Sequence, residues 1–168
     1  MIMGIIGSDQ GYPLTAFGEM GERWVVGELR RRGYVVEWIG GRSAYDLLIE
    51  GYARAEVKSA TLAKNALRGG YRWQFNLRRH GLLVDEDVLF LLCWEDLEGP
   101  PVAVFVVPGS AVYAQLSKIE ITSRDPCTYR GRWSRYREDW GQVRQVVERL
   151  PARQRPLFRR RVQERVPF

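Results

Sequence analysis

The sequence YDLLIEGYARAEVKSA, residues 45–60, contains two carboxylates and a lysine within strand-like segments. Its alternation of apolar and polar residues predicts two strands, 45–50 and 54–60, joined by a turn. Asp46 and Glu56 are symmetric about Gly51, so a turn centred there would place the two carboxylates opposite each other, with Cβ atoms about 4.5–5.5 Å apart. A two-residue loop would instead place Asp46 opposite Val57.

Strand parity assigns the hairpin side chains to two faces. The face turned toward the core is expected to carry Tyr45, Leu47, Ile49, Ala55 and Val57. The other face is expected to carry Asp46, Glu50, Arg54, Glu56 and Lys58.

This pattern of charges suits metal-assisted hydrolysis of a phosphodiester. Two facing carboxylates repel each other unless a cation lies between them, and hard ions such as Mg²⁺ prefer such oxygen ligands. The Lys58 ammonium, beside them, could orient an attacking water or stabilise charge on a phosphoryl oxygen. The alternative is an ordinary amphipathic hairpin with a solvated face, on which Glu56 and Lys58 form a weak surface ion pair.

A third carboxylate precedes this hairpin. Residues 13–33 predict a helix with Thr15 as its N-cap and Gly33 just after its end. Glu22 lies on or beside the apolar stripe of that helix, where a carboxylate is costly without a cation or a partner. The small Gly18 and Gly21 would let the helix approach the sheet closely. Two other helix residues, Glu19 and Glu28, compete with Glu22 for this role.

These segments together resemble the PD-(D/E)XK nuclease superfamily. The matching stretches are GEMGERWVVGELRRRGY, YDLLIE and AEVKSA. They are most similar to the branch that holds archaeal Holliday-junction resolvases and the intron-encoded homing endonucleases built on this fold. In that pattern a helix carries Glu in a G-x-x-G-E context, one strand begins with Asp, and the next strand carries E-x-K. Tyr45 occupies the position of the nominal proline, which is often absent in these enzymes.

The resemblance implies a role for each matched residue. Asp46 and Glu56 would bind Mg²⁺, with Mn²⁺ as the alternative ion, and the backbone carbonyl of Val57 would complete the inner shell. Lys58 would position or activate the water, and Glu22 would bind the metal or hold a metal-bound water. Cleavage would leave a 5′-phosphate. The implied fold is an α/β, restriction-endonuclease-like core, a central mixed β-sheet flanked by helices.

Six residues near the motif are candidate DNA contacts. Two occupy the Gly-rich turn before Asp46, where a DNA backbone could pass. Three basic residues follow the motif and suit phosphate contacts, and a glutamine would lie beside Lys58 if its strand paired with the motif strand. A generic surface or loop position is the alternative for each. The six are Arg42, Ser43, Lys64, Arg68, Arg72 and Gln74.

The periodicity of the remaining chain predicts further strands and a second helix. Residues 34–40 predict a strand, and residues 71–79 alternate apolar and polar residues. Residues 87–96 and 102–108 are nearly continuous apolar runs, typical of strands buried on both faces. A short helix is expected over 109–116, an edge strand over 118–122 and an amphipathic helix over 137–150. A helix, five or six strands and a helix predict a mixed α/β sheet with helices on its faces.

The composition indicates one globular domain with an uneven charge. With 168 residues and 45% hydrophobic residues the chain can bury a core, and no apolar run reaches the roughly 18 residues of a membrane helix. Residues 129–168 contain twelve Arg, no Lys and four acids, a charge of +8 that leaves −2 of the total +6 for residues 1–128. We therefore expect a single nuclease-like domain over 1–150 and a basic arm or extension over 151–168, suited to nucleic acid or simply solvated.

Single residues with reactive side chains add little further. Cys93 and Cys127 fit no metal spacing and favour reduced thiols in a cytoplasmic protein. His80 has no Ser or Cys partner in a motif context and is interpreted as a loop histidine.

The leading hypothesis is a metal-dependent endonuclease that cuts duplex or branched DNA. Because cutting both strands usually needs two active sites, a homodimer or higher homo-oligomer is expected. The sequence does not separate a junction resolvase from a site-specific homing or restriction-type enzyme. The alternatives are a non-catalytic nucleic-acid-binding or assembly protein on the same fold, and a structural α/β domain whose polar hairpin face is merely solvated.

Overall fold

The computed structural model describes residues 14–40, 43–64, 67–79, 82–83, 87–112 and 116–149. Arg42, His80 and the basic segment 151–168 lie outside the described residues, so the expectations for them stay predictions. None of the helices in the described ranges is long and apolar enough to cross a membrane.

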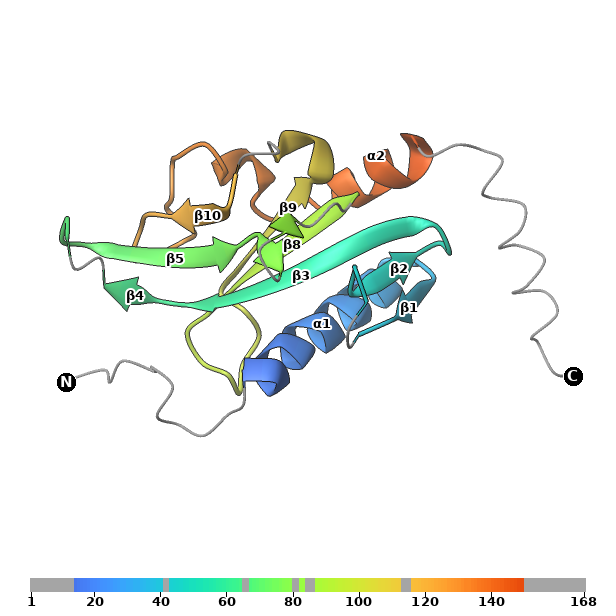
Figure 1. The fold of residues 1–168 in the computed structure, drawn as a ribbon, viewed down its shortest axis with the longest axis horizontal. Coiled ribbons are helices and arrows are strands. Elements are labelled where there is room, and N and C mark those ends of the chain that lie inside the picture. Colours follow the sequence, from blue (N-terminus) through green and yellow to red (C-terminus); the bar gives the residue numbers. More distant parts are fainter. Residues whose placement is uncertain are drawn as a thin grey trace, which may run out of the picture.

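A five-stranded mixed sheet forms the centre of the molecule (Figure 1). Its neighbouring strands are antiparallel except for β3 and β8, which run parallel. Since a parallel pair needs a crossover connection, the chain leaves the sheet after β3 and returns at β8. In spatial order the strands are β1 (Val36–Trp38), β2 (Leu47–Ile49), β3 (Ala53–Thr61), β8 (Val88–Trp94) and β9 (Ala103–Pro108).

Two helices, α1 (Leu14–Arg31) and α2 (Gly141–Arg149), pack on one face of this sheet. Val25 and Leu29 of α1 are buried in the same cluster as Val143 of α2. The helix α1 ends as expected, since Gly33 has a φ of 88° and its N–H donates to the Arg30 carbonyl.

The other face of the central sheet is covered by a second, three-stranded sheet. Trp73 and Phe75 of its middle strand are buried against Leu89 and Leu91 of β8. All residues of β8 and β9 are buried, as their apolar sequences predicted, because both faces are covered. The second sheet has the order β10 (Lys118–Ile121), β5 (Tyr71–Asn76) and β4 (Ala63–Lys64), and a separate pair joins β6 (Arg78–Arg79) to β7 (Leu82–Leu83).

The mixed α/β class with a central mixed sheet and helices is confirmed, with four corrections. Both described helices cover the same face, and a small sheet takes the place expected for helices on the other. Thr15 is not the N-cap, because α1 already includes Leu14. The described part of 109–116 holds only the 3₁₀ turn η2 (Gly109–Ala111), and a second such turn is η3 (Ser134–Tyr136). The ten strands of the described residues exceed the expected five or six, since several are two-residue segments that periodicity does not detect.

Candidate active site

The turn between β2 and β3 is centred on Gly51. Glu50 and Gly51 both have positive φ, 53° and 77°, and the register pairs Leu47 with Ala55 and Ile49 with Ala53. A non-glycine residue with positive φ is uncommon. Glu50 is held there because its N–H donates to the Val35 carbonyl and its Oε1 accepts from the Val35 N–H. The expected register is confirmed over Leu47–Ile49, and Asp46 lies just beyond the end of this ladder.

Asp46 lies where the β2–β3 ladder ends. Its own N–H donates to the Ala55 carbonyl, one position out of the strict register. Its carboxylate Oδ2 then accepts the N–H of Val57 at 2.8 Å, in place of a backbone carbonyl. With 3% of its surface exposed, Asp46 is fixed against the strand that carries the E-x-K residues.

Glu56 and Lys58 form a close pair on β3. The Lys58 Nζ donates to Glu56 Oε1 at 2.5 Å, and Glu56 is 0% exposed. Asp46 and Glu56 are the charged residues found buried among the described residues. The pair is therefore not the solvated surface ion pair considered above. Tyr45, expected on the core face, is half-buried rather than part of the buried core.

Glu22 reaches the same region from α1. Its Oε2 accepts a hydrogen bond of 2.5 Å from Trp38 Nε1 at the end of β1, and the side chain is half-buried. Burial raises the pKa of the Glu22 carboxyl, and the negative charges of Asp46 and Glu56 raise it further, whereas the hydrogen bond from Trp38 lowers it. Glu22 therefore lies within electrostatic reach of Asp46 and Glu56.

The position of Glu22 depends on its neighbour Gly21. A Cβ built on Gly21 would collide with Ser59 Oγ and would lie 3.1 Å from Leu92 Cδ1, so glycine lets α1 touch β3 and β8 here. Gly18 does not share this role, since a Cβ there meets nothing within 4 Å. Of the competing acids, Glu28 forms ion pairs with Arg31 and Arg32 on the helix itself.

The donor chemistry of this carboxylate group suits a hard cation, although one oxygen of each of the three carboxylates accepts a hydrogen bond from a protein donor in this conformation. No group of three His, Cys, Asp or Glu within the described part of the chain converges as a ready-made metal site. Mg²⁺ commonly binds through only one or two carboxylates and keeps several waters. Asp46 and Glu56 are buried, and their charges raise the pKa of Glu22. A bound cation would reduce the repulsion among these three carboxylates, so the residues fit such an ion.

The candidate DNA contacts separate into two places. Ser43 is half-buried in the loop before Asp46, whereas Lys64, on β4, and Arg68 are exposed. The strand pairing on which the placement of Gln74 beside Lys58 depended does not form, because β5 pairs with β4 and β10 rather than with β3. The reason is that β4 directly follows β3 and takes the edge of β5.

Sequence reasoning missed Trp38, Lys118 and Glu120. The pattern of residues 34–40 predicts only that Trp38 lies in a strand, yet its Nε1 donates to Glu22 across 16 positions. Lys118 and Glu120 alternate with two buried isoleucines on β10, so their outward direction could have been predicted. Their partner Arg72 could not, because Glu120 Oε1 accepts from Arg72 Nη1 across 48 positions.

Comparisons with known proteins give a likeness at the level of the fold. No protein-family model matches the chain, and no curated protein matches it. A solved structure described as a bacterial homing endonuclease, I-Ssp6803I, is similar with a TM-score of 0.57 and 25% sequence identity. The likeness covers 79% of this chain and 92% of that one. The chain therefore has an endonuclease-like fold, similar to that of a bacterial homing endonuclease.

Proposed function

We propose that this chain is a metal-dependent DNA endonuclease of the PD-(D/E)XK type, which hydrolyses phosphodiester bonds in duplex DNA. The observation that carries the proposal is the contact of Asp46 with the backbone of Val57, between Glu56 and Lys58. It joins the Asp of one strand to the E-x-K of the next within a buried group. The likeness to a homing endonuclease favours a site-specific enzyme over a junction resolvase.

The metal, Mg²⁺ or alternatively Mn²⁺, would be held by Asp46, Glu56 and the Val57 carbonyl, with Glu22 as a further ligand or the holder of a bound water. When bound, such an ion supplies Lewis-acid stabilisation of the charge that grows on a phosphoryl oxygen. Lys58 has the donor chemistry to orient the attacking water, and its 2.5 Å contact with Glu56 fixes where its ammonium lies. Trp38 would keep the Glu22 carboxylate directed toward the group.

A homodimer or higher homo-oligomer supports this function. The described part of the chain has one such group of carboxylates, and a double-strand cut needs an attack on each strand. Two copies related by a two-fold axis would present two equivalent groups to a duplex.

The test is cleavage of supercoiled plasmid, a duplex library and a four-way junction in Mg²⁺, with EDTA as the metal-free condition. Wild type should cut duplex DNA only with the metal, and Asp46→Asn should not. Asp96→Asn is the matched control, because Asp96 also accepts a backbone N–H, that of Glu98 at 2.9 Å. Mn²⁺ binding, followed by electron paramagnetic resonance, should weaken in Asp46→Asn alone.

The outcomes separate the alternatives. Preferred cutting of the junction would identify a resolvase. Salt-sensitive DNA binding without cutting in either metal would identify the non-catalytic binding protein. If the protein neither binds nor cuts DNA, a structural domain is the remaining alternative.

A further inference from the structure

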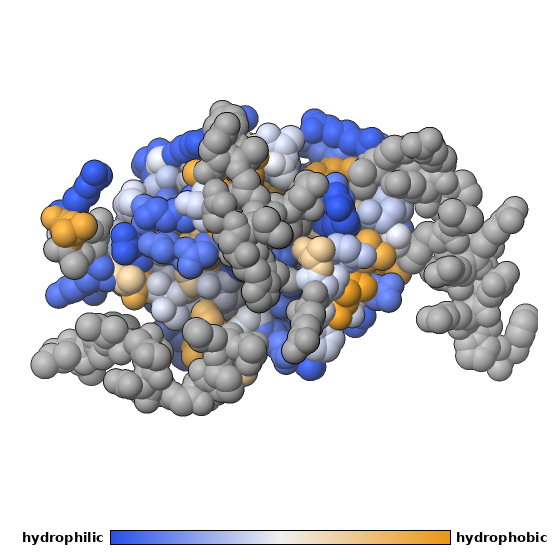
Figure 2. All heavy atoms as spheres, in the orientation of Figure 1, coloured by the Kyte–Doolittle hydropathy of each residue, from blue (hydrophilic) through white to orange (hydrophobic). Residues whose placement is uncertain are grey.

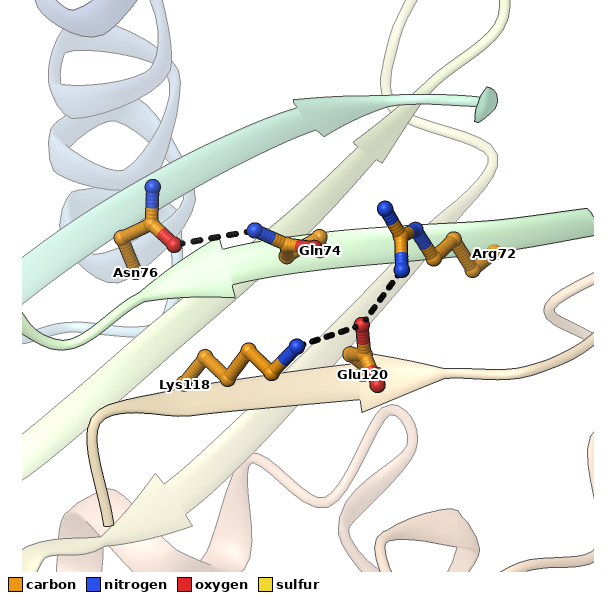
Figure 3. Close-up of polar contacts among 5 residues, drawn as sticks. All are labelled: Arg72, Gln74, Asn76, Lys118 and Glu120. Carbon is orange, nitrogen blue, oxygen red and sulfur yellow. Dashed lines mark hydrogen bonds and ion pairs between the residues drawn. The ribbon is translucent and has the colours of Figure 1, made fainter. Parts of the chain in front are cut away.

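The three-stranded sheet has a polar outer face formed by residues outside the proposed catalytic motif. Trp73, Phe75, Ile119 and Ile121 are buried beneath it. The residues that alternate with them point outward from β5 and β10 (Figure 3). We call these five the β5–β10 face: Arg72, Gln74, Asn76, Lys118 and Glu120.

The β5–β10 face is an ordered array. The register places Lys118 opposite Asn76 and Glu120 opposite Gln74. Glu120 Oε1 accepts from Arg72 Nη1 at 3.1 Å and from Lys118 Nζ at 3.2 Å, and Gln74 Nε2 donates to Asn76 Oδ1 at 3.1 Å (Figure 3). These contacts hold long side chains in defined positions before any partner binds, which reduces the entropy lost on binding.

A basic hollow adjoins this array. It has a volume of about 730 Å³, and four of its eleven lining residues are basic whereas one, Glu120, is acidic. Arg124 lies over the Tyr71 ring, with 5.3 Å from its guanidinium carbon to the ring centroid. Gly69 and Gly70, both with positive φ, form its rim beside Arg68. Figure 2 shows hydrophilic residues gathered over β5 and β10 on this side of the molecule.

The residue types match the edges of bases in the major groove. Arg and Lys pair with guanine, Asn and Gln with adenine, and Glu accepts from cytosine. Residues two apart on a strand are about 6.6 Å apart, close to two steps of about 3.4 Å along a DNA strand. The major groove is about 12 Å wide and admits a two-stranded ribbon.

Glu120 distinguishes base reading from simple phosphate binding. A surface that only neutralised phosphates would gain nothing from a carboxylate between Arg72 and Lys118. In a reading face, that carboxylate sets the direction of both cations and repels a phosphate backbone that approaches out of register.

We propose that the β5–β10 face reads base pairs in the major groove of duplex DNA, while Arg68 and Arg124 contact the adjacent phosphates. This assignment rests on the proposed endonuclease function, since it names the part of the chain that selects the site to be cut. The occupant is duplex DNA. The basic hollow complements the charge of its phosphates, and the amides of Gln74 and Asn76 on the β5–β10 face complement the hydrogen-bonding groups of its bases.

The test selects preferred sites from a randomised duplex library, without divalent metal, for wild type and for Gln74→Glu. Gln145→Glu is the matched control, because it makes the same change on the exposed side of α2. Gln74→Glu should change the preferred base at one or two adjacent positions and weaken binding to the wild-type site roughly 5- to 150-fold. Gln145→Glu should select the wild-type site.

Two further variants examine the charges. Arg124→Ala should keep the selected site and reduce the slope of log affinity against log salt by about 1. Glu120→Gln should strengthen binding to unrelated duplexes and weaken the preference for the selected site. An unchanged selected site in Gln74→Glu, or a wild type that selects no site, would overturn the proposal.

The proposal and the endonuclease function fail in different ways. Asp46→Asn should select the wild-type site without cutting it. If wild type selects a site but does not cut it in Mg²⁺ or Mn²⁺, the endonuclease function is contradicted and the reading face is supported. If wild type and Gln74→Glu cut at the same sequence, the reading face is contradicted and the endonuclease function is supported.

Discussion

The Asp46 carboxylate accepts a 2.8 Å hydrogen bond from the backbone N–H of Val57, the residue between Glu56 and Lys58. One acidic residue of the site thus fixes the strand that carries the other two functional side chains. Because the same carboxylate is proposed to bind metal, its structural and catalytic roles overlap, and only a variant that keeps the acceptor can separate them.

Asp46→Ala and Asp46→Asn are therefore expected to differ in stability and to agree in activity. Alanine leaves the Val57 N–H without this acceptor and should lower the free energy of unfolding by about 1–3 kcal/mol. Asparagine keeps an acceptor oxygen and should cost less. Both should reduce cleavage by at least about 100-fold. Thermal unfolding and initial cleavage rates measure the two effects, and equal unfolding temperatures for the variants would contradict the structural role.

Lys58→Ala should be markedly less stable than wild type at neutral pH. It removes an ammonium 2.5 Å from Glu56, which is 0% exposed, and removal of one partner of a buried ion pair costs about 3 kcal/mol. Adding Glu56→Gln should recover part of that loss, because the buried charge is then absent. Urea unfolding of the two single variants and the double variant gives the coupling energy. A coupling near zero would show that the pair contributes nothing.

Gly21→Ala should destabilise the protein, whereas Gly18→Ala should not. The new Cβ at position 21 would collide with Ser59 and press on Leu92, and overpacking of this kind costs about 1–3 kcal/mol. At position 18 the Cβ meets nothing within 4 Å. The higher helix propensity of alanine should therefore raise the free energy of unfolding by about 0.5–1 kcal/mol. Thermal unfolding of both variants tests this, and a stabilised Gly21→Ala would mean that α1 is not in close contact with β3.

The raised pKa of Glu22 gives a defined pH dependence in the absence of divalent metal. The folded protein holds this proton to higher pH than the unfolded chain does, so the contribution of Glu22 to stability is present at acidic pH and is lost as pH rises through its folded pKa. Glu22→Gln should lack this decline. Urea unfolding in EDTA from pH 4 to pH 8 compares the two proteins, and parallel curves would contradict the raised pKa.

Trp38→Phe should raise the pKa of Glu22 further. Phenylalanine lacks the indole N–H that holds this pKa down through a 2.5 Å hydrogen bond. It keeps an aromatic ring beneath Arg23, whose guanidinium carbon lies 4.6 Å from the Trp38 ring centroid. The carboxyl titration of Glu22, followed by nuclear magnetic resonance, should move to higher pH. A titration that moves to lower pH or stays unchanged would show that this bond does not stabilise the ionised form.

The sequence alone determined the features that depend on residues close together in the chain. Asp46 and Glu56 are equally spaced from Gly51, and since a short turn sets the register of its own hairpin, the sequence limited the hairpin to two registers, of which the structure has the one that pairs Leu47 with Ala55. The alternation of Trp73 and Phe75 with Gln74 and Asn76 likewise determined which side chains of β5 face inward. The continuous apolar runs of β8 and β9 indicated strands covered on both faces.

Only the tertiary structure decided which elements meet. Trp38 reaches Glu22 and Glu120 reaches Arg72 because separate strands and a helix pack together, across 16 and 48 positions of sequence. The burial of Asp46 and Glu56 was equally undetermined, since strand parity gives the face of a side chain but not what covers that face. Long-range pairing depends on the shape and burial of the whole fold, and no single segment of the sequence contains that information.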